Sequence, residues 1–504
     1  MTEPLPGQVL RAPVTHAGTL TPHVTVIGTE RGDPDEIAGR VTNDLTGDGI
    51  GHRDGDRGAR PVRGHRRSGG TMPAVTGHGH DGAQDHGQGH HGHDHGDPSA
   101  MRPVAEHAAA VAALLAPMPA ETVPLAAARG RVLADDLVSP HALPPFANSA
   151  MDGYAVRSAD LAGAPAELPV AADIPAGRTD GPPLAPGTAH RIMTGAAMPD
   201  GADAVVQVEW TDAGTEQVRV DRAVGAGQNV RGAGEDVTPG QVVLTAGTLL
   251  GPAQIGLAAA VGAGTLAVRR RPRVLVLSTG SELVAPGEPL RHGQIHESNG
   301  PMLTAAVDDA GARGELLRFV PDDVEQFTRT LDEALAARSD DPVDLVLTSG
   351  GVSAGAYEVV KDAFSGRGVT FSKVAMQPGM PQGVGHHRGP AGDVAVVTLP
   401  GNPVSSLVSF EVFVRPVLRR VLGHPQPERP RVRARVAEAL TSPAGRRQFR
   451  RGRIDAVAGT VAPVGAAGSH LLAALAHADC LFVVDEDVTR VEAGESVEVW
   501  LLDG

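Results

Sequence analysis

Residues 273–282 read RVLVLSTGSE, and the same plan recurs as DLVLTSGGVS at residues 344–353 and as VAVVTLPGNP at residues 394–403. Each stretch begins with an unbroken apolar run, which is typical of a strand that is buried on both faces of a sheet. Each run ends in a loop rich in glycine or proline that leads toward a helix, and the last of these helices is expected over 404–422. Together the three stretches predict a parallel α/β domain over residues 271–423.

The loops that follow these strands should gather at one edge of the sheet, because the carboxyl ends of parallel strands meet there. Loop amides favour an anion such as a phosphate at that edge, although a glycine-rich loop by itself is equally typical of a tight turn. Glu282, Asp322 and Glu358 lie near these loops. Carboxylates beside a phosphate are the ligands that Mg²⁺ prefers, so the set predicts metal-assisted chemistry on a phosphoanhydride, whereas any one of them alone also fits a helix cap or a solvated charge.

The rest of the chain divides by its own patterns. Short apolar runs broken by Gly and Pro predict a β-rich insert at residues 144–235. Alternating apolar and polar residues near the carboxyl end predict a C-terminal β domain at residues 424–504, as a small β barrel or a sandwich. The predicted fold class is therefore α/β and multidomain. Single elements expected in these regions are a helix over 106–115 and strands over 204–208, 431–436 and 496–501.

Residues 1–100 are rich in Gly, Asp, Arg and His and have almost no apolar periodicity, which predicts a disordered tail with at most a short strand over 23–27. The tail contains a histidine tract made of His78, His80, His86, His90, His91, His93 and His95. Imidazoles at this density can hold a divalent metal as a reservoir, or they can form a solvated tail with no part in turnover. The sequence leaves both interpretations open.

Composition excludes several classes of protein. The formal charge of −15 and the dispersed arginines leave no basic stripe, so we expect no nucleic-acid partner. The single cysteine, Cys480, lies beside an apolar run, which excludes a disulfide framework and predicts a buried thiol. No stretch approaches the roughly 20 apolar residues of a membrane span, and the first residues lack a leader pattern. We therefore expect no membrane partner and a cytoplasmic location.

The motifs taken together resemble the molybdopterin molybdenumtransferase family, which includes the carboxy-terminal domain of gephyrin. The resemblance runs in order from about Arg102 to Gly504 and covers none of the first 100 residues. Its most specific block is NSAMDGYA at residues 148–155. The motifs are PPFANSAMDGYAVR (144–157), RIMTGA (191–196), GADAVV (201–206), NVR (229–231) with GED (234–236), STGSEL (278–283), GQIHESN (293–299), TSGGVS (348–353) and LPGNP (399–403).

This resemblance implies an elongated homodimer with a pterin-binding α/β domain and an extended linker subdomain, made of residues 101–143 and 236–270 on either side of the β-rich insert in sequence. The active site would lie in a cleft between the α/β domain of one protomer and the β-rich insert of the other. It implies transfer of molybdenum from molybdate to adenylylated molybdopterin, with Mg²⁺ as cofactor and AMP as product. The molybdate oxyanion would lie among lysine, arginine, serine and backbone amides. Further implied partners are the pterin adenylyltransferase and molybdoenzyme apoproteins.

The resemblance also assigns roles to residues in the matching motifs. The catalytic set is Asp152, Thr194, Glu282, Lys373, Pro400 and Pro403. The substrate-binding set is Ser149, Arg231, Thr279, Gly280, Ser298, Asn299, Ser349, Gly350, Gly351, Ser353, Gly401, Asn402 and Ser469. The metal set is Glu282, Asp322 and Glu358, with Asp323 adjacent to the second. Plainer roles remain open: Asp152 also fits a turn before Gly153, and Ser469 also fits a helix cap.

Some positions depart from the common family pattern. Gln377 and Met380 stand where many relatives carry lysine, which removes two cations from the expected anion site. Glu358 and Glu297 stand where aspartate is more usual, and Ser281 replaces a frequent aspartate. The leading alternative from another class is a noncatalytic pterin-binding protein or scaffold, which has no need for the full acidic set. A pterin adenylyltransferase would share the α/β domain but lack the block at residues 148–155.

Overall fold

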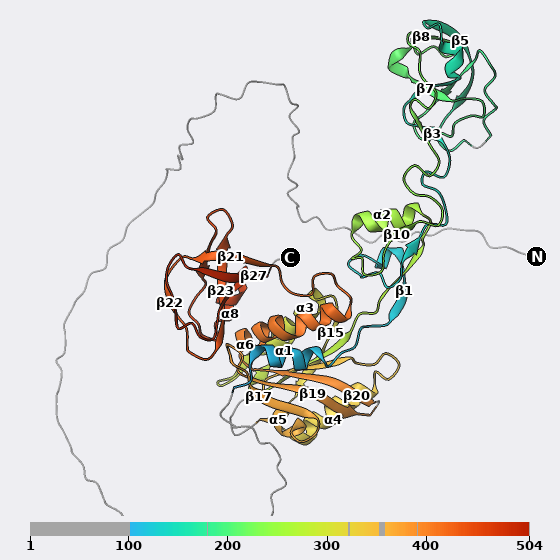
Figure 1. The fold of residues 1–504 in the computed structure, drawn as a ribbon. Helices are drawn as coiled ribbons and strands as arrows, with labels where there is room; N and C mark the ends of the chain where they lie inside the picture. Colours follow the sequence, from blue (N-terminus) through green and yellow to red (C-terminus); the bar gives the residue numbers. More distant parts are fainter. Residues whose placement is uncertain (1–100, 179, 321–322, 352–357, 391, 503–504) are drawn as a thin grey trace, which may run out of the picture. The chain divides into compact units, whose positions relative to one another are not determined.

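A six-stranded mixed sheet forms the centre of the α/β domain in the computed structural model, which describes residues 101–178, 180–320, 323–351, 358–390 and 392–502 (Figure 1). The strand order is β15-β12-β16-β20-β19-β17. The first four strands are parallel, as predicted, whereas β19 and β17 add an antiparallel edge that the sequence analysis did not predict. The bounds are β12 Arg273–Thr279, β15 Arg313–Val320, β16 Leu345–Ser349, β17 Val369–Lys373, β19 Pro381–Gly389 and β20 Gly392–Leu399.

Helices cover both faces of this sheet, which explains why its strands are apolar without alternation. Val274 and Val276 of β12 pack into one buried cluster with α3 (Asn299–Asp309) and α6 (Pro403–Ser409), while Leu275 and Leu277 pack into another with α4 (Val324–Ala336) and α5 (Val359–Phe364). Figure 1 shows α1, α3 and α6 on one side of the sheet and α4 and α5 on the other. The apolar residues of β12 therefore alternate between two cores, one on each face of the sheet.

The long helix expected over 404–422 is three segments. After α6 the chain forms a π-helical turn, η4 (Phe410–Val414), and continues as α7 (Arg415–Val421). Pro416 has no backbone N–H to donate to the preceding turn, which favours an irregular hydrogen-bond pattern at this point. The wider turn still buries its side chains, including Phe410 and Phe413, against α1 (Val104–Ala112).

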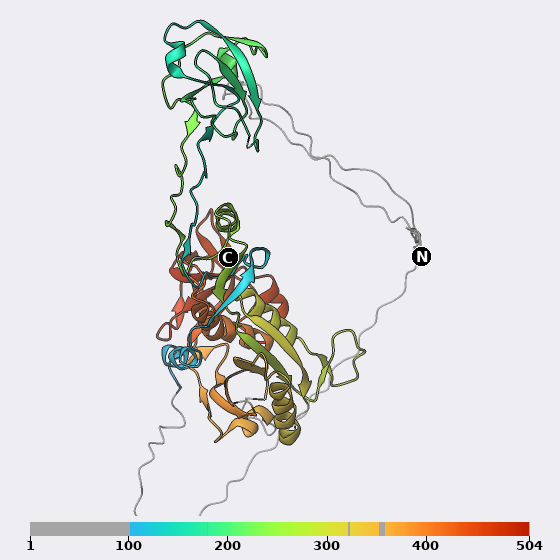
Figure 2. The same cartoon turned by 90° about the vertical axis from the view of Figure 1, so that its right-hand side faces the viewer.

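The β-rich insert contains a five-stranded sheet of order β7-β4-β6-β5-β8 with its own apolar core (Figures 1 and 2). A separate two-stranded pair joins β3 to β9, and β3 ends three residues before Asp152 in sequence. The bounds are β3 Asn148–Ser149, β4 Gly153–Val156, β5 Ala166–Ile174, β6 Ala189–Ile192, β7 Ala204–Gln207, β8 Gln217–Val220 and β9 Val230–Arg231, with short 3-10 helices η2 Ser158–Leu161 and η3 Val208–Trp210.

The chain enters and leaves the insert through a small linker subdomain, in which segments from either side of the insert pair with each other. Strand β1 (Ala120–Pro124) pairs with β11 (Thr265–Arg269), and β2 (Leu137–Val138) pairs with β10 (Val242–Leu244). Helix α2 (Pro252–Ala260) and the 3-10 helix η1 (Leu125–Ala127) pack with them around Leu133 and Leu250.

Five strands of the C-terminal part lie in the order β23-β24-β21-β27-β25, and the two end strands, β23 and β25, also pair with each other. The sheet is therefore a closed barrel. A short strand of the α/β domain, β18 (Met376–Gln377), pairs in parallel with β23 and joins the two domains. Cys480 is buried in β25, as predicted, and burial raises the pKa of its thiol to about 12. The bounds are β21 Arg431–Val436, β22 Leu440–Thr441, β23 Arg447–Asp455, β24 Thr460–Pro463, β25 Cys480–Val484, β26 Arg490–Val491, β27 Ser496–Leu501 and α8 Leu472–Ala476.

Candidate active site

A cavity of about 970 Å³ opens at the carboxyl edge of the parallel strands. Its walls come from the loops after β12, β16 and β20, from the start of α3, from the loop 376–381, and from the C-terminal barrel. Ligands of open α/β sheets bind at this edge, where the strands end in loops. Fourteen of the predicted site residues line it: Thr279, Gly280, Glu282, Ser298, Asn299, Ser349, Gly350, Gly351, Glu358, Pro400, Gly401, Asn402, Pro403 and Ser469.

Glycines shape the loops after β12 and β16. Gly350 has a φ of +95°, and a Cβ atom there would lie 2.8 Å from the carbonyl oxygen of Thr279. A Cβ atom at Gly280 would lie 2.7 Å from a carboxylate oxygen of Glu282. Only glycine allows the two loops to approach each other and the carboxylate to fold back over the backbone. The signature STGSE therefore places Glu282 at the wall of the cavity.

Three carboxylates line the same cavity. Glu297 is buried, and its Oε1 accepts hydrogen bonds from Ser278 Oγ (2.9 Å) and from the backbone N–H of Gly300 (2.7 Å). Glu358 is buried directly before α5, and Glu282 is exposed. Within the described ranges no three His, Cys, Asp or Glu side chains are grouped closely enough to form a metal cage. Any cation held here would thus depend on ligand oxygens for part of its coordination.

Asn299 connects three of the loops. Its Nδ2 donates to Ser349 Oγ (2.9 Å) and to the carbonyl oxygen of Gly401 (2.6 Å), while Ser349 Oγ lies 3.3 Å from the carbonyl oxygen of Pro400. Asn299 Oδ1 and Thr279 Oγ1 are buried and have no hydrogen-bond partner in the described part of the chain. Buried polar atoms of this kind are normally satisfied, so both are suited to bind a polar ligand in the cavity.

The C-terminal barrel forms the opposite wall through Arg446 and residues 467–470. Asn402 Nδ2 donates to Ser469 Oγ (3.0 Å), and the backbone N–H of Val404 donates to the Ser469 carbonyl oxygen (3.1 Å). Of the polar residues on this wall, only Ser469 was predicted from the sequence, whereas Arg446 and His470 were not. Arg446 is one of many dispersed arginines, and nothing in the local sequence distinguishes it before the barrel is folded.

Lys373 is not among the residues that line the cavity. It is exposed at the end of β17, and the loop that follows contributes Gln377 and Met380 to the cavity instead. The lining thus contains no lysine, and its one guanidinium is that of Arg446. Arg446 is half-buried and forms no ion pair with any residue that the structure describes.

The insert holds a second group of predicted residues, none of which lines the cavity: Ser149, Asp152, Thr194 and Arg231. Asp152 Oδ1 accepts hydrogen bonds from the Thr194 backbone N–H (2.7 Å) and from Thr194 Oγ1 (2.8 Å). These two hydrogen bonds hold the pKa of Asp152 below its usual value and keep it a carboxylate, and the bond from the backbone has the larger effect. Ser149 and Arg231 lie on the paired strands β3 and β9.

Gly153 explains why this group has its sequence signature. A Cβ atom at Gly153 would lie 1.9 Å from the Val206 carbonyl oxygen on the neighbouring strand β7. Glycine is thus required for the strands to pair directly after Asp152. Two other predicted residues, Asp322 and Ser353, and the histidine tract lie outside the described residues. The neighbouring Asp323 caps α4 by accepting from the Gln326 backbone N–H (2.7 Å).

Comparisons with known proteins match nearly all of the chain after residue 101. Family models match in three consecutive stretches: the MoeA N-terminal region (domain I and II) at residues 102–262, a probable molybdopterin binding domain at 275–420, and the MoeA C-terminal region (domain IV) at 433–502. Molybdopterin molybdenumtransferase 2 of Mycobacterium tuberculosis (strain ATCC 25618 / H37Rv) is 53% identical over 411 residues, which cover 79% of this chain and 99% of that protein.

More distant relatives give the same result. The molybdopterin molybdenumtransferase of Haemophilus influenzae is 36% identical over 398 residues, which cover 76% of this chain and 94% of that protein. The crystal structure of the molybdopterin biosynthesis moeA protein from Pyrococcus horikoshii OT3 is similar with a TM-score of 0.65 at 30% identity, and the match covers 80% of this chain and all of that chain.

Proposed function

Because this chain belongs to the molybdopterin molybdenumtransferase family, we propose that it transfers molybdenum from molybdate to adenylylated molybdopterin and releases AMP. It is a transferase of molybdenum cofactor biosynthesis, as its curated relatives are named. The observation that carries the finer proposal is the cavity at the carboxyl edge of the sheet, which combines carboxylates, loop amides and an unpaired guanidinium. A noncatalytic scaffold would need no such combination.

The two walls of the cavity differ in charge, and this difference orients the substrates. Glu282 and Glu358 lie on the wall made by the α/β domain, which also contains the glycine-rich loops after β12 and β16. The pyrophosphate linkage of an adenylylated pterin fits this wall, because the loop amides can bind its oxygens. Asn299 Oδ1 and Thr279 Oγ1, which lack partners, are available for polar groups of the pterin.

The carboxylates of this wall fit Mg²⁺. Magnesium in proteins is usually held by one or two carboxylates together with substrate phosphates and water, and Glu282 and Glu358 supply two such groups. We propose that these residues hold the cation against the phosphoanhydride, with Asp322 as a third ligand from the metal set. When bound, Mg²⁺ would neutralise charge on the phosphate oxygens as the adenylyl linkage is cleaved.

The opposite wall fits the molybdate oxyanion. Arg446 has no ion pair within the described residues, so its guanidinium is free to bind an anion, and Ser469 adds a hydroxyl that Asn402 already orients. Arg446 supplies positive charge to the cavity from this wall, whereas Gln377 and Met380 carry none. We expect Lys373, exposed at the end of β17, to contribute to anion binding only from the rim.

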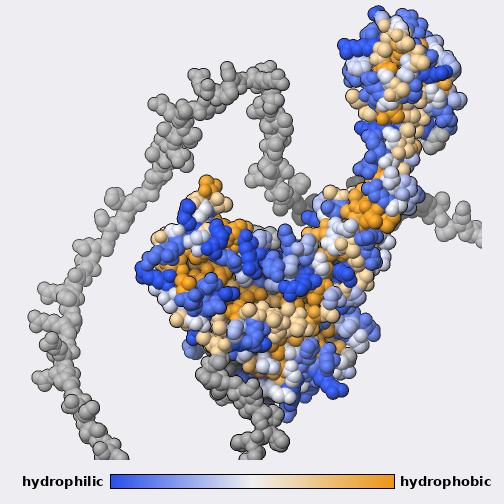
Figure 3. All heavy atoms as spheres, in the orientation of Figure 1, coloured by the Kyte–Doolittle hydropathy of each residue, from blue (hydrophilic) through white to orange (hydrophobic). Residues whose placement is uncertain are grey.

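The second group of predicted residues, Ser149, Asp152, Thr194 and Arg231 of the insert, does not line the cavity of its own chain. In a homodimer this group could complete the site of the other chain. We propose that the insert of one protomer supplies Asp152 to the cavity of its partner. Apolar side chains exposed on the linker subdomain support association. Val138, Val242 and Leu249 are all more than a third exposed, and Figure 3 shows an apolar patch over α2 and β10.

One assay tests the proposed reaction. The purified chain is mixed with adenylylated molybdopterin, Mg²⁺ and molybdate, and both AMP release and molybdenum bound to the pterin are followed with time. We expect AMP release to fall by at least about 100-fold in Asp152→Asn and in Glu282→Gln, because each removes a charge at the reacting phosphate. The matched control is Asp160→Asn, an acidic residue of the insert away from Thr194. Wild-type AMP release no greater than that of Asp152→Asn would refute the transferase reaction.

The alternative of a pterin-binding scaffold is not favoured by the comparisons, since the curated relatives are transferases. Further proposals concern the setting of the enzyme: a cytoplasmic location, supply of substrate by a pterin adenylyltransferase, and delivery of product to molybdoenzyme apoproteins. No helix among the described residues has the length and apolar character needed to cross a membrane.

A further inference from the structure

We propose that His470 donates the proton that lets an oxygen of molybdate depart as water when a sulfur of the pterin binds molybdenum. This inference rests on the proposed molybdenum transfer and adds a catalytic residue to it. His470 lies on the C-terminal wall of the cavity, on the same loop as Ser469. That wall also carries Arg446, the guanidinium that we expect to bind the oxyanion.

The chemistry requires a proton donor at this wall. When a thiol of the dithiolene attacks molybdate, a Mo–S bond forms while the S–H and one Mo–O bond break. The departing oxygen keeps the electron pair of the Mo–O bond and needs two protons to leave as water. The thiol supplies one and the imidazolium of His470 supplies the other, so that molybdate, thiol and imidazolium give a trioxo-thiolate anion, water and neutral imidazole. Molybdenum stays in its hexavalent state, and no oxidant or reductant is needed.

Few groups in the cavity can provide that proton. No lysine lines the cavity among the residues that the structure describes, and arginine does not give up its proton in proteins. The charged and titratable groups that share the cavity with His470 are Arg446, His296, Glu282, Glu297 and Glu358. Glu297 Oε1 accepts two hydrogen bonds, and Glu282 and Glu358 are the carboxylates proposed to hold the cation, which leaves the two imidazoles as donors.

The two imidazoles differ in their surroundings. His296 Nε2 donates to the carbonyl oxygen of Glu288 (2.9 Å), so that nitrogen is occupied, and His296 belongs to the loop that also carries Glu297. His470 has no side-chain hydrogen-bond partner among the residues that the structure describes, and it is exposed at the cavity. It can therefore turn a nitrogen toward a bound ligand and take up a new proton from solvent after each turnover.

The backbone around His470 is fixed, which a proton donor needs. A Cβ atom at Gly468 would lie 3.1 Å from the His470 ring, so the ring packs against this glycine. Arg451, which is buried, donates hydrogen bonds to the carbonyl oxygens of Gly468 (3.0 Å) and Ala466. Asn402 holds Ser469 from the other side. The loop is thereby held between the two domains, and the imidazole is presented to the cavity.

The test compares His470→Gln with wild type in a single-turnover assay that follows transfer of molybdenum to the pterin. Glutamine keeps a polar side chain but cannot act as a proton donor, so we expect the rate constant of transfer to fall by at least about 100-fold. The dissociation constant for adenylylated molybdopterin, measured by titration, should change by less than about threefold, because His470 lies on the wall away from the glycine-rich loops. His477→Gln, an exposed histidine near this loop but outside the cavity, is the matched control.

The dependence on pH separates a proton donor from a structural residue. The wild-type transfer rate should fall as the pH rises, because the step consumes a proton from its donor, and the rate of His470→Gln should lack this fall. Imidazole added to His470→Ala should restore part of the rate, since the cavity has room for it.

The outcomes are distinguishable. A His470→Gln variant that transfers molybdenum at the wild-type rate with the wild-type pH profile would overturn the role of His470, while the transferase activity itself would stand. A wild-type protein that transfers no molybdenum would instead refute the proposed function. Lost pterin binding in His470→Gln would indicate a binding role and also contradict proton donation.

Discussion

At the scale of single residues, Arg451 on β23 shows how a buried charge can serve a site that it does not touch. Its guanidinium donates to three carbonyl oxygens of one loop, those of Val464 (3.5 Å), Ala466 and Gly468 (3.0 Å), and it forms no ion pair in the described chain. Burial has the largest effect on the pKa of Arg451 and lowers it, and the positive charge of Arg450 lowers it further. The loop leads directly to Ser469 and His470, so Arg451 positions both cavity residues.

We expect Arg451→Met to raise the Michaelis constant for molybdate several-fold and to lower the melting temperature, because three part-buried hydrogen bonds from a charged donor are lost at a cost of about 1–3 kcal/mol. Arg451→Lys should recover part of both effects, since an ammonium can still donate to one or two of the carbonyls. Arg453→Met is the control on the same strand, where the side chain is exposed and donates to His477. Unchanged molybdate dependence in Arg451→Met would contradict a positioning role.

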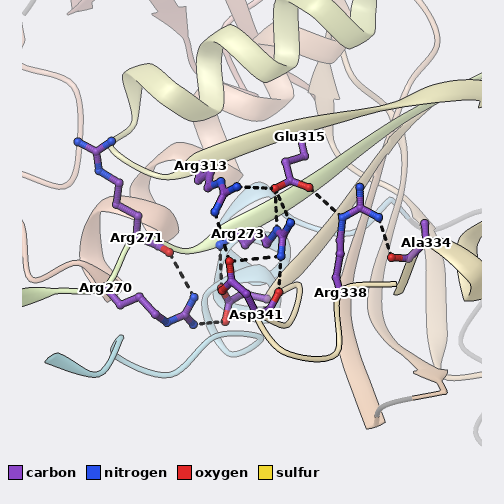
Figure 4. Close-up of polar contacts among 9 residues, drawn as sticks. Arg270, Arg271, Arg273, Arg313, Glu315, Ala334, Arg338 and Asp341 are labelled. Atoms are coloured by element: carbon purple, nitrogen blue, oxygen red, sulfur yellow. Dashed lines mark hydrogen bonds and ion pairs between the residues drawn. The ribbon is translucent and has the colours of Figure 1, made fainter. Parts of the chain in front are cut away.

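At the scale of elements, a polar network ties together the amino ends of β12, β15 and β16, at the sheet edge opposite the cavity (Figure 4). Glu315 of β15 forms ion pairs with Arg273 of β12 (2.7 Å), with Arg338 after α4 (2.8 Å) and with Arg313 (3.4 Å). Arg270 pairs with Asp344, which also accepts from the Arg273 backbone N–H (2.7 Å). The apolar strands need such contacts at their ends, because core packing alone does not fix how far neighbouring strands are offset.

Burial raises the pKa of Glu315, but hydrogen bonds from Arg338 and Arg273 outweigh it, so the pKa lies below its ordinary value of 4.5. The carboxylate therefore stabilises the fold above that value, and the stabilisation is lost as the pH falls through the lowered pKa. We expect Glu315→Gln to cost about 1–3 kcal/mol at pH 7, measured by urea unfolding, and the cost to shrink below about pH 4.

The control for this network is Glu333→Gln, an exposed carboxylate on α4 with no ion pair in the described chain. Its effect on the unfolding free energy should stay within about 0.5 kcal/mol at either pH. A Glu315→Gln variant with an equal loss of stability at pH 7 and pH 3.5 would show that packing, and not the charge, is responsible.

At the scale of the whole molecule, the predicted catalytic residues other than Lys373 form two groups, one around the cavity and one in the insert. If these groups meet across a dimer, the two defects Asp152→Asn and Glu282→Gln should complement each other. A mixed dimer would hold one intact site and one doubly defective site, because each site takes Asp152 from one chain and Glu282 from the other.

We expect random mixing of the two inactive variants by co-expression to restore about a quarter of wild-type activity, since half of the dimers are mixed and half of their sites are intact. Light scattering of the same preparation should give the mass of a dimer. Each variant expressed alone serves as the control. No recovered activity in a preparation that contains mixed dimers would contradict a shared site and place both groups within one chain.

The sequence by itself determined the central strands, the glycine-rich loops after them and the family. The runs at 273–278, 345–348 and 394–399 form β12, β16 and β20. They could be predicted because a strand that is buried on both faces is a nearly continuous apolar run in the sequence. Ser349 ends β16, while Glu282 and Asn402 lie in the loops after β12 and β20. Because the carboxyl ends of parallel strands meet at one edge of a sheet, the sequence predicted that these loops lie together. Cys480 was predicted to be buried for the same local reason.

Only the tertiary structure decided the other wall of the cavity and the irregular elements. Arg446 and His470 are more than 40 residues beyond the last predicted loop, and they reach the cavity because β18 pairs with β23 and Asn402 binds Ser469. The antiparallel edge β19-β17 and the π-helical turn also depend on packing against distant helices. Local periodicity records which face of an element is buried, whereas contacts between domains depend on where each element lies once the chain has folded.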